Sequence, residues 1–344
     1  MPLDTLGMFD LTAGLPEQVE AAAQLARGWG GLRDAATIEQ VVVIGMGGSG
    51  MAGDVVAAVA APMLAVPVIT VKSYECPAFV DANSLVFAVS ASGETEETLQ
   101  AASDAAAAGA TMIVICGGGR LAELGASWGA PVVAVPPGIP QPRAALGAMA
   151  IPPLIVLEEM GLYRAGHQWI EAAVDQLKRR RDELAGAGES SAAAEVARRI
   201  GRTFPLVHGG GAVGAAAAQR WKTQINENAK APAFWSAQPE LCHNEVCGWG
   251  QHGDVTRQVM TAIALRHDAE HPQVGHRFAL VAELLREVVA DVIEVRAAGE
   301  GDLAQLFDLI LFGDYVSLWL AVQAGVDPGP VPVLAELKVE LERP

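Results

Sequence analysis

The sequence contains few cysteines and few basic residues, and each shortage excludes a class of protein. Its four cysteines (Cys76, Cys116, Cys242 and Cys247) form no C-x-x-C pair, and no disulfide framework is suggested in a chain of 344 residues. We therefore expect reduced thiols and a cytoplasmic location. Lysine and arginine number 23 against 40 acidic residues, a net charge of -17 that argues against nucleic acid as a partner. An acidic protein can still bind a small anion at a locally positive loop.

The chain also lacks the features of secretion and of membrane insertion. No basic segment followed by an apolar core opens the sequence, so no signal peptide is predicted. The longest apolar run, 303–325, is interrupted by Asp308 and by the pair Gly313-Asp314. Charges inside such a run favour a buried helix or helix pair over a membrane span.

Zinc is the one metal that the residue types suggest. Cys242, His243, Cys247 and His252 lie close together along the chain. Their spacing matches no standard zinc pattern, so we expect no metal site.

Short apolar runs, in contrast, alternate regularly with alanine-rich helical stretches, and the length suggests two domains. Strands are predicted over 41–44, 66–71, 85–89, 112–116 and 131–135, and again over 206–208, 259–265 and 292–295. Strands separated by helices indicate parallel doubly wound sheets. Because the pattern restarts with a second glycine-rich loop after 208, we expect a duplicated α/β architecture.

The first glycine loop does not by itself reveal its ligand. The stretch 45-GMGGSG-50 contains the G-x-G-x-x-G of dinucleotide sites, but its Gly47, Gly48 and Ser49 also suit a sugar or a phosphate. A dinucleotide site needs an acidic residue at the end of the second strand to hold the ribose. That strand ends in Lys72, which disfavours a nicotinamide cofactor.

Three hydroxyls follow the third predicted strand. Ser90, Ser92 and Thr95 lie in 90-SASGETEETL-99, immediately before a predicted helix. Hydroxyls and free backbone N–H groups at a helix start form a good cradle for an anion. The alternative is a capping box between Ser92 or Thr95 and a downstream glutamate. A cap needs one hydroxyl and three are present, so a phosphate site is favoured.

Six ordered blocks match a known pattern, namely 45-GMGGSGMAGD-54, 90-SASGETEETL-99, 141-QPRAALG-147, 226-NENAKAPAF-234, 239-PELCHNEVCGW-249 and 313-GDYVSLWLA-321. With them the chain resembles the bifunctional phosphoglucose/phosphomannose isomerases, which are built from two sugar isomerase (SIS) domains. The resemblance implies two doubly wound parallel-sheet SIS domains, each a flavodoxin-like or Rossmann-like three-layer sandwich. We expect a phosphate-binding domain over 1–160, a helical linker over 161–203, and a catalytic domain with a C-terminal tail over 204–344.

The resemblance also implies a reaction. Glucose 6-phosphate and mannose 6-phosphate would be interconverted with fructose 6-phosphate through a cis-enediol, without a cofactor. Moving a proton between C2 and C1 requires a base, a ring opener, a partner for the enediolate oxygen and a phosphate anchor. A carboxylate suits the base, because it can remove a proton from one carbon and return it to the next. A sugar-phosphate-binding regulator without catalysis and a nicotinamide oxidoreductase remain alternatives.

Four residues are expected to carry the chemistry. Glu227 of N-E-N matches the family's base, and the poor helix propensity of Asn-Glu-Asn favours a function over a surface pair with Lys230. The resemblance further implies that His243 opens the ring, that Arg143 stabilises the enediolate and that Lys338 aids ring opening. The alternatives are a packed histidine, a loop-anchoring arginine and a solvated lysine.

A homodimer with an active site shared between subunits is implied as well, with the histidine contributed by the partner. The apolar helix predicted over 303–325 offers more hydrophobic surface than one α/β half needs, which points the same way. Two positions depart from the pattern. Glu94 stands in the phosphate loop where the family usually has asparagine, and Gly329 stands where many relatives have the threonine of D-P-T-P. A carboxylate beside a phosphate would repel it unless it faces away.

Overall fold

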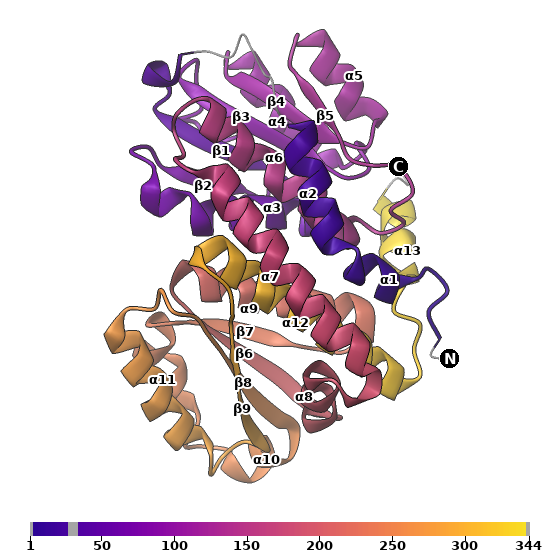
Figure 1. Ribbon diagram of the computed structural model, residues 1–344, viewed down its shortest axis with the longest axis vertical. Coiled ribbons are helices and arrows are strands. Elements are labelled where there is room, and N and C mark those ends of the chain that lie inside the picture. Colours follow the sequence, from indigo (N-terminus) through magenta and orange to yellow (C-terminus); the bar gives the residue numbers. More distant parts are fainter. Residues whose placement is uncertain (1–2, 27–33, 342–344) are drawn as a thin grey trace.

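The computed structural model describes residues 3–26 and 34–341, which form two α/β halves (Figure 1). The first half contains a parallel five-stranded sheet, sheet A, in the order β2-β1-β3-β4-β5. Its strands are β1 (Gln40–Ile44), β2 (Val68–Val71), β3 (Ser84–Ser90), β4 (Thr111–Cys116) and β5 (Val132–Ala134). The central strand β3 is buried along its whole length, as expected for a parallel strand covered on both faces.

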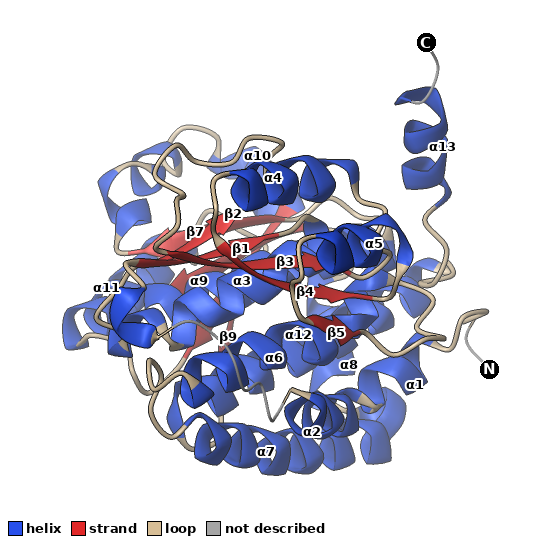
Figure 2. Ribbon diagram, turned by 90° about the horizontal axis from the view of Figure 1, so that it is seen from above, coloured by secondary structure: helices blue, strands red, loops and turns tan. Residues whose placement is uncertain are grey.

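Helices cover sheet A on both sides (Figure 2). One face packs on α3 (Gly47–Val59) and α6 (Leu146–Glu159), and the other on α4 (Glu96–Ala107) and α5 (Gly119–Ser127). Alternate residues of each strand supply the two cores: Leu85 and Phe87 point to one, Val86 and Ala88 to the other. The predicted three-layer arrangement is therefore confirmed in this half.

The second half repeats the topology on a parallel four-stranded sheet, sheet B, in the order β7-β6-β8-β9. Its strands are β6 (Phe204–Gly210), β7 (Phe234–Gln238), β8 (Met260–Arg266) and β9 (Asp291–Arg296). The first four strands of each half have the same relative order, which confirms the predicted duplication. Sequence reasoning missed β7, because this short edge strand exposes Phe234 and Trp235 and shows no buried alternation.

The remaining helices cover sheet B and join the halves. On the face toward the first half lie α8 (Ala192–Ile200), α9 (Gly211–Gln224) and α12 (Gly301–Ala324), and on the far face α10 (Gly253–Val259) and α11 (Pro272–Leu285). The chain begins with α1 (Met8–Ala13) and α2 (Leu15–Leu25) and ends with α13 (Pro332–Leu341). Between the halves, α7 (Gly166–Ala187) runs along both of them (Figure 1). The segment 161–203 is thus helical and packs on α2 and α12.

Helix α12 lies at the junction of the halves, against α7, α8 and α9. All residues from Leu303 to Leu318 are buried, as expected for a helix that is apolar on every side. The run is therefore one buried helix; although long and apolar enough to cross a membrane, it forms the core of the protein. Its apolar surface is used within the chain, so the expectation that this surface serves a dimer is wrong.

The charges that interrupt this helix are paired inside the protein. Asp308 accepts hydrogen bonds from Arg180 Nε and Nη2, each 2.7 Å long, and another of 2.7 Å from Gln176. Asp314 accepts two from Arg220, at 3.1 and 2.8 Å. Buried charges are tolerated when they are paired in this way, and losing one partner is costly.

Close packing of α12 on α9 allows a direct test. A Cβ at Gly313 would lie 2.2 Å from the Trp221 ring nitrogen, whereas nothing lies within 4 Å of one at Gly186 in α7. We expect Gly313→Ala to lower the free energy of unfolding by about 1–3 kcal/mol through overpacking. The matched Gly186→Ala should raise it by about 0.5–1 kcal/mol, because alanine favours the helix. Urea denaturation measures both, and equal effects at the two sites would contradict this packing.

Candidate active site

A single buried arginine joins three parts of the chain. Arg143 lies in a short 3-10 turn, Pro142–Ala145, and is 1% exposed. Its Nε donates to Asn228 Oδ1 (2.8 Å), and its Nη1 to Gln141 Oε1 (3.0 Å) and Glu227 Oε2 (3.2 Å). Its Nη2 donates to the backbone oxygens of Pro328 (2.7 Å) and Gly329 (2.8 Å). A guanidinium has five N–H donors, so each donor of Arg143 has a partner.

Glu227 is held beside this arginine by an unusual turn. After α9 the chain makes one π-helical turn, Ile225–Ala229, which anchors Ile225 and Ala229 in the core and leaves the Glu227 side chain 28% exposed. Single π turns of this kind often occur at functional sites. Burial lowers the pKa of Arg143, while the charge of Glu227 opposes that shift. The carboxylate is therefore fixed at a half-open surface by a buried cation.

The neighbouring Asn228 points inward and supports the pair. Its Nδ2 donates to Ser317 Oγ (2.9 Å), and Ser317 in turn donates to the Asp314 backbone oxygen (2.6 Å). This leaves the amide oxygen of Asn228 facing Arg143. Sequence reasoning did not single out Asn228 or Gln141, although both lie in the Q-P-R and N-E-N blocks that carried the resemblance.

The first glycine loop lies directly against Arg143. Gly47 has a positive φ of 53° and opens α3, and a Cβ at Gly48 would lie 3.0 Å from the backbone of Arg143. A side chain at Gly48 would therefore push the two segments apart. Ser49 is buried, and its Oγ accepts a hydrogen bond of 3.1 Å from the Ala91 backbone N–H. Its position makes Ser49 a link between the glycine loop and the hydroxyl loop.

The hydroxyl loop, residues 90–95, is internally ordered. Ser90 Oγ lies 3.0 Å from Thr95 Oγ1 and accepts a 3.1 Å bond from the Gly93 N–H, while Ser92 Oγ accepts a 3.2 Å bond from the Glu94 N–H. Thr95 occupies the N-cap position of α4, yet its side chain makes no capping hydrogen bond. The capping box considered above is thus not formed, and the first turn of α4 keeps N–H groups available to an anion.

Glu94, the departure in this loop, is turned toward a neighbouring helix. Its Oε1 accepts a 2.8 Å hydrogen bond from the backbone N–H of Arg120, in the first turn of α5. A carboxylate is stabilised there by the helix dipole and by an otherwise unpaired donor. The structure thereby accounts for a negative charge in a loop expected to hold phosphate.

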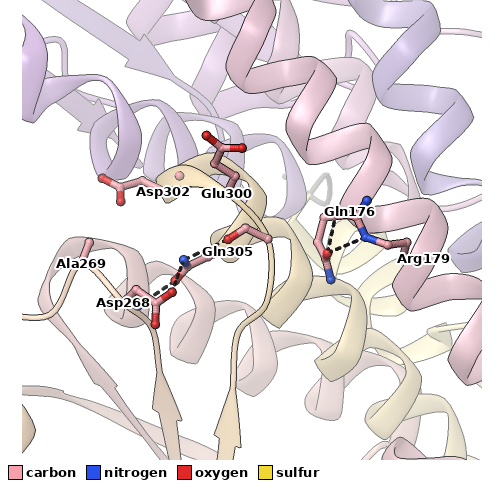
Figure 3. Close-up of a pocket in the computed structure, with 9 residues that line it drawn as sticks. Gln176, Arg179, Asp268, Ala269, Glu300, Asp302 and Gln305 are labelled. Carbon is pink, nitrogen blue, oxygen red and sulfur yellow. Dashed lines mark hydrogen bonds between the residues drawn. The ribbon is translucent and has the colours of Figure 1, made fainter.

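In the second half, the loop after β8 corresponds to the hydroxyl loop after β3, and it contains acidic residues in place of hydroxyls. After β8, Glu270 Oε1 accepts a 3.0 Å bond from the His267 N–H, and Arg266 pairs with the same carboxylate at 2.7 Å. A nearby hollow of about 690 Å³ is lined by Gln176, Arg179, Asp268, Ala269, Gly299, Glu300, Gly301, Asp302 and Gln305 (Figure 3). Three carboxylates face one arginine in this hollow, so it is unsuited to a phosphate, and the hydroxyl loop of the first half is the better anion site.

Two predicted site residues lie apart from Glu227 within the chain. His243, in the short turn Glu240–His243, is exposed, and its side chain makes no hydrogen bond to any described residue. Its neighbour Leu241 packs on the far face of sheet B, with Leu206, whereas Ile225 packs on the face toward the first half, with Val207. Successive strand residues face opposite sides, so the segments that carry His243 and Glu227 pack, through Leu241 and Ile225, on opposite faces of sheet B.

Lys338 also lies away from this cluster. It is on α13, which projects from the body of the chain and is exposed along its length (Figure 2). The four residues considered for zinc are not grouped either. Cys242 Sγ donates to Gln238 Oε1 (3.1 Å), and residues 3–26 and 34–341 contain no cluster of three possible ligands.

Comparison with known proteins agrees with this arrangement. The family model described as the bacterial phospho-glucose isomerase C-terminal SIS domain matches residues 189–341, and the SIS domain model matches residues 36–121. A bifunctional phosphoglucose/phosphomannose isomerase of Caldicellulosiruptor bescii is 36% identical over 337 residues, which cover 97% of this chain and 98% of the relative. The chain belongs to this isomerase family.

Other relatives support the family and the fold. A bifunctional phosphoglucose/phosphomannose isomerase of Aquifex aeolicus is 33% identical over 90% of this chain and 93% of its own. The crystal structure of tagatose-6-phosphate ketose/aldose isomerase from Escherichia coli superimposes with a TM-score of 0.67 at 15% identity, covering 96% of each chain. The two-domain SIS fold predicted from the sequence is thereby confirmed for this isomerase-family chain.

The orientation of Glu94 leads to a prediction. Because its carboxylate caps α5, Glu94→Ala should lower the free energy of unfolding by about 1 kcal/mol, the usual cost of losing a cap. The Michaelis constant for fructose 6-phosphate should change by less than about threefold, a difference under 1 kcal/mol. Thermal denaturation and steady-state kinetics measure the two effects. A tenfold fall in the Michaelis constant would mean that Glu94 repels the phosphate after all.

Proposed function

We propose that this protein interconverts fructose 6-phosphate with glucose 6-phosphate and mannose 6-phosphate through a cis-enediol, without a cofactor. One observation carries the proposal: the hydroxyl loop, the glycine loop, Arg143 and Glu227 are in continuous contact. Ser49 bonds to Ala91 of the hydroxyl loop, Gly48 lies against Arg143, and Arg143 holds Glu227. An anion cradle is thus coupled to a base.

In this proposal the phosphate binds at Ser90, Ser92 and Thr95, and Gly47 and Gly48 let the sugar approach the backbone. Glu227 removes the C2 proton of the open-chain aldose and returns it to C1. Loss of the C2 proton makes that carbon planar. Enediols from both epimers can therefore use one base, provided that the pocket allows rotation about C2–C3. The carbonyl oxygen of Gly329 accepts a hydrogen bond from Arg143, and a Cβ at this position would lie 2.8 Å from the side chain of Leu6.

Ring opening is assigned to His243, supplied by a second subunit. A neutral imidazole can carry the proton between the ring oxygen and the O1 hydroxyl. The segments that carry His243 and Glu227 pack on opposite faces of sheet B, through Leu241 and Ile225, which supports a site completed across a homodimer. The role of Lys338 in ring opening stays a prediction, as does the cytoplasmic location.

The shared base is tested by one substitution. Glu227→Gln keeps the size of the side chain and removes its proton-accepting charge. Both isomerisation activities should fall together by at least about a thousandfold, or about 4 kcal/mol in barrier, with fructose 6-phosphate still bound. Coupled assays with each epimer, alongside calorimetric binding, measure this. A variant that loses one epimer's activity and keeps the other's would show that two separate bases act.

The shared site is tested by mixing subunits. Glu227→Gln and His243→Ala chains are each expected to be nearly inactive alone. Because a heterodimer of the two contains one intact site, mixing after subunit exchange should restore part of the activity, up to about a quarter of wild type for random pairing with two sites per dimer. Exchange is verified by mass spectrometry of differently tagged chains. Verified heterodimers with no activity would rule out a site shared in this way.

A further inference from the structure

The arrangement of Arg143 raises a question about the proposed reaction. When Glu227 removes a proton from carbon, negative charge develops on the enediolate oxygen, and a donor aimed at that oxygen lowers the barrier. By resemblance Arg143 has this role. Its five N–H groups already bind Asn228, Gln141, Glu227 and two backbone oxygens. In this structure Arg143 orients Glu227 and has no unpartnered N–H group, so a hydrogen bond from it to the intermediate would replace one of these bonds, most readily the 3.2 Å bond to Glu227.

Lys230 is the neighbouring cation with a donor to spare. Its Nζ donates to the Glu227 backbone oxygen (2.6 Å) and to the Pro328 backbone oxygen (3.0 Å). The Pro328 oxygen also accepts from Arg143 Nη2, so the two cations meet at one carbonyl. An ammonium has three N–H donors, and the third makes no bond to any described residue. Lys230 is one of five lysines in the chain and was considered above only as a surface partner of Glu227.

The backbone at Lys230 supports a functional reading. The residue ends the π turn with φ 56° and ψ 28°, in the left-handed region. A non-glycine residue there costs about 1–2 kcal/mol, and glycine is the usual residue at such a helix end. A lysine kept in a strained conformation beside the proposed base is better explained by its ammonium group than by its backbone preference.

We propose that Lys230 is a further catalytic residue, whose ammonium group donates a hydrogen bond to the enediolate oxygen while Glu227 holds the proton taken from carbon. The inference rests on the proposed isomerase function. In this step the electron pair of the C–H bond becomes the enediolate, and Glu227 gains the proton. Lys230 stays protonated throughout and contributes charge and one hydrogen bond. Arg143 positions Glu227 and the segment at Pro328 and Gly329, and its expected role at the enediolate stays a prediction.

The charged groups facing Lys230 come from three segments: Glu227 from its own turn, Arg143 from the 3-10 turn and Asp327 from the segment before α13. Burial, reinforced by the charge of Arg143, lowers the pKa of Lys230, while Asp327 and Glu227 oppose the shift. If the charged form is needed, activity should fall as the pH rises through this lowered pKa. The loss of activity at alkaline pH, the alkaline limb of the pH profile, should thus begin below the ordinary lysine pKa of about 10.4.

Substitutions at Lys230 test the proposal. Lys230→Met should lower kcat for fructose 6-phosphate by about 100- to 1,000-fold, the usual cost of removing one such donor, with KM changed less than about threefold. Lys230→Arg keeps the charge, should retain more activity and should move the alkaline limb upward. Lys178→Met is the matched control, because Lys178 forms an exposed pair with Glu20 and should leave kcat unchanged.

A mimic of the intermediate separates catalysis from folding and from substrate binding. Arabinonate 5-phosphate, whose carboxylate resembles the enediolate, should bind Lys230→Met more weakly by about the same factor as kcat falls. Equal losses of affinity for this mimic and for fructose 6-phosphate would overturn the proposal, as would near wild-type kcat in Lys230→Met. If Lys230→Met fails to fold, the pH profiles of wild type and Lys230→Arg test the proposal instead. The proposal is overturned if activity falls at the same alkaline pH in both proteins. Wild-type protein that does not isomerise fructose 6-phosphate would instead refute the proposed function itself.

Discussion

The buried guanidinium of Arg143 is the interaction on which the rest of the site depends. It binds the Q-P-R segment of the first half, the N-E-N turn of the second half and the carbonyls that precede α13. Removing one partner from a buried charge of this kind costs about 3–5 kcal/mol. The candidate active site draws residues from both halves, so its geometry depends on the contacts that Arg143 makes with each of them.

Helix α12 makes that junction rigid. Its apolar surface fills the space between the halves, and its two interior acids are each bound by an arginine from a neighbouring helix, Asp308 by Arg180 of α7 and Asp314 by Arg220 of α9. Arg220 also donates a 2.7 Å bond to the backbone oxygen of Arg143. The ion pairs thus fix the register of α12, and one of them extends directly to Arg143. A polar interruption that looked like a break in a helix is part of the support of the site.

The two halves share a topology but divide the work. The loop after β3 presents hydroxyls and the open first turn of α4, whereas the corresponding loop after β8 binds its own N–H group with Glu270. In the second half, the carboxylate of Glu270 therefore occupies a backbone donor of the loop. The second half contributes Glu227 instead, at the end of the helix that follows its glycine loop.

The sequence by itself determined the duplicated parallel sheets, because periodicity and glycine loops are local properties. It also pointed to the hydroxyl loop as a candidate anion site and to Glu227 and Arg143 as residues to test, because both lie in ordered motifs. It did not reveal β7, since an exposed edge strand lacks the alternation that marks a buried one. Only the tertiary structure decided that Glu94 faces α5, that Asn228 and Gln141 hold Arg143, and that Lys230 shares a carbonyl with it. Those contacts join residues from distant parts of the chain, such as Arg143 and Pro328, and no local pattern encodes a hydrogen bond across such a separation.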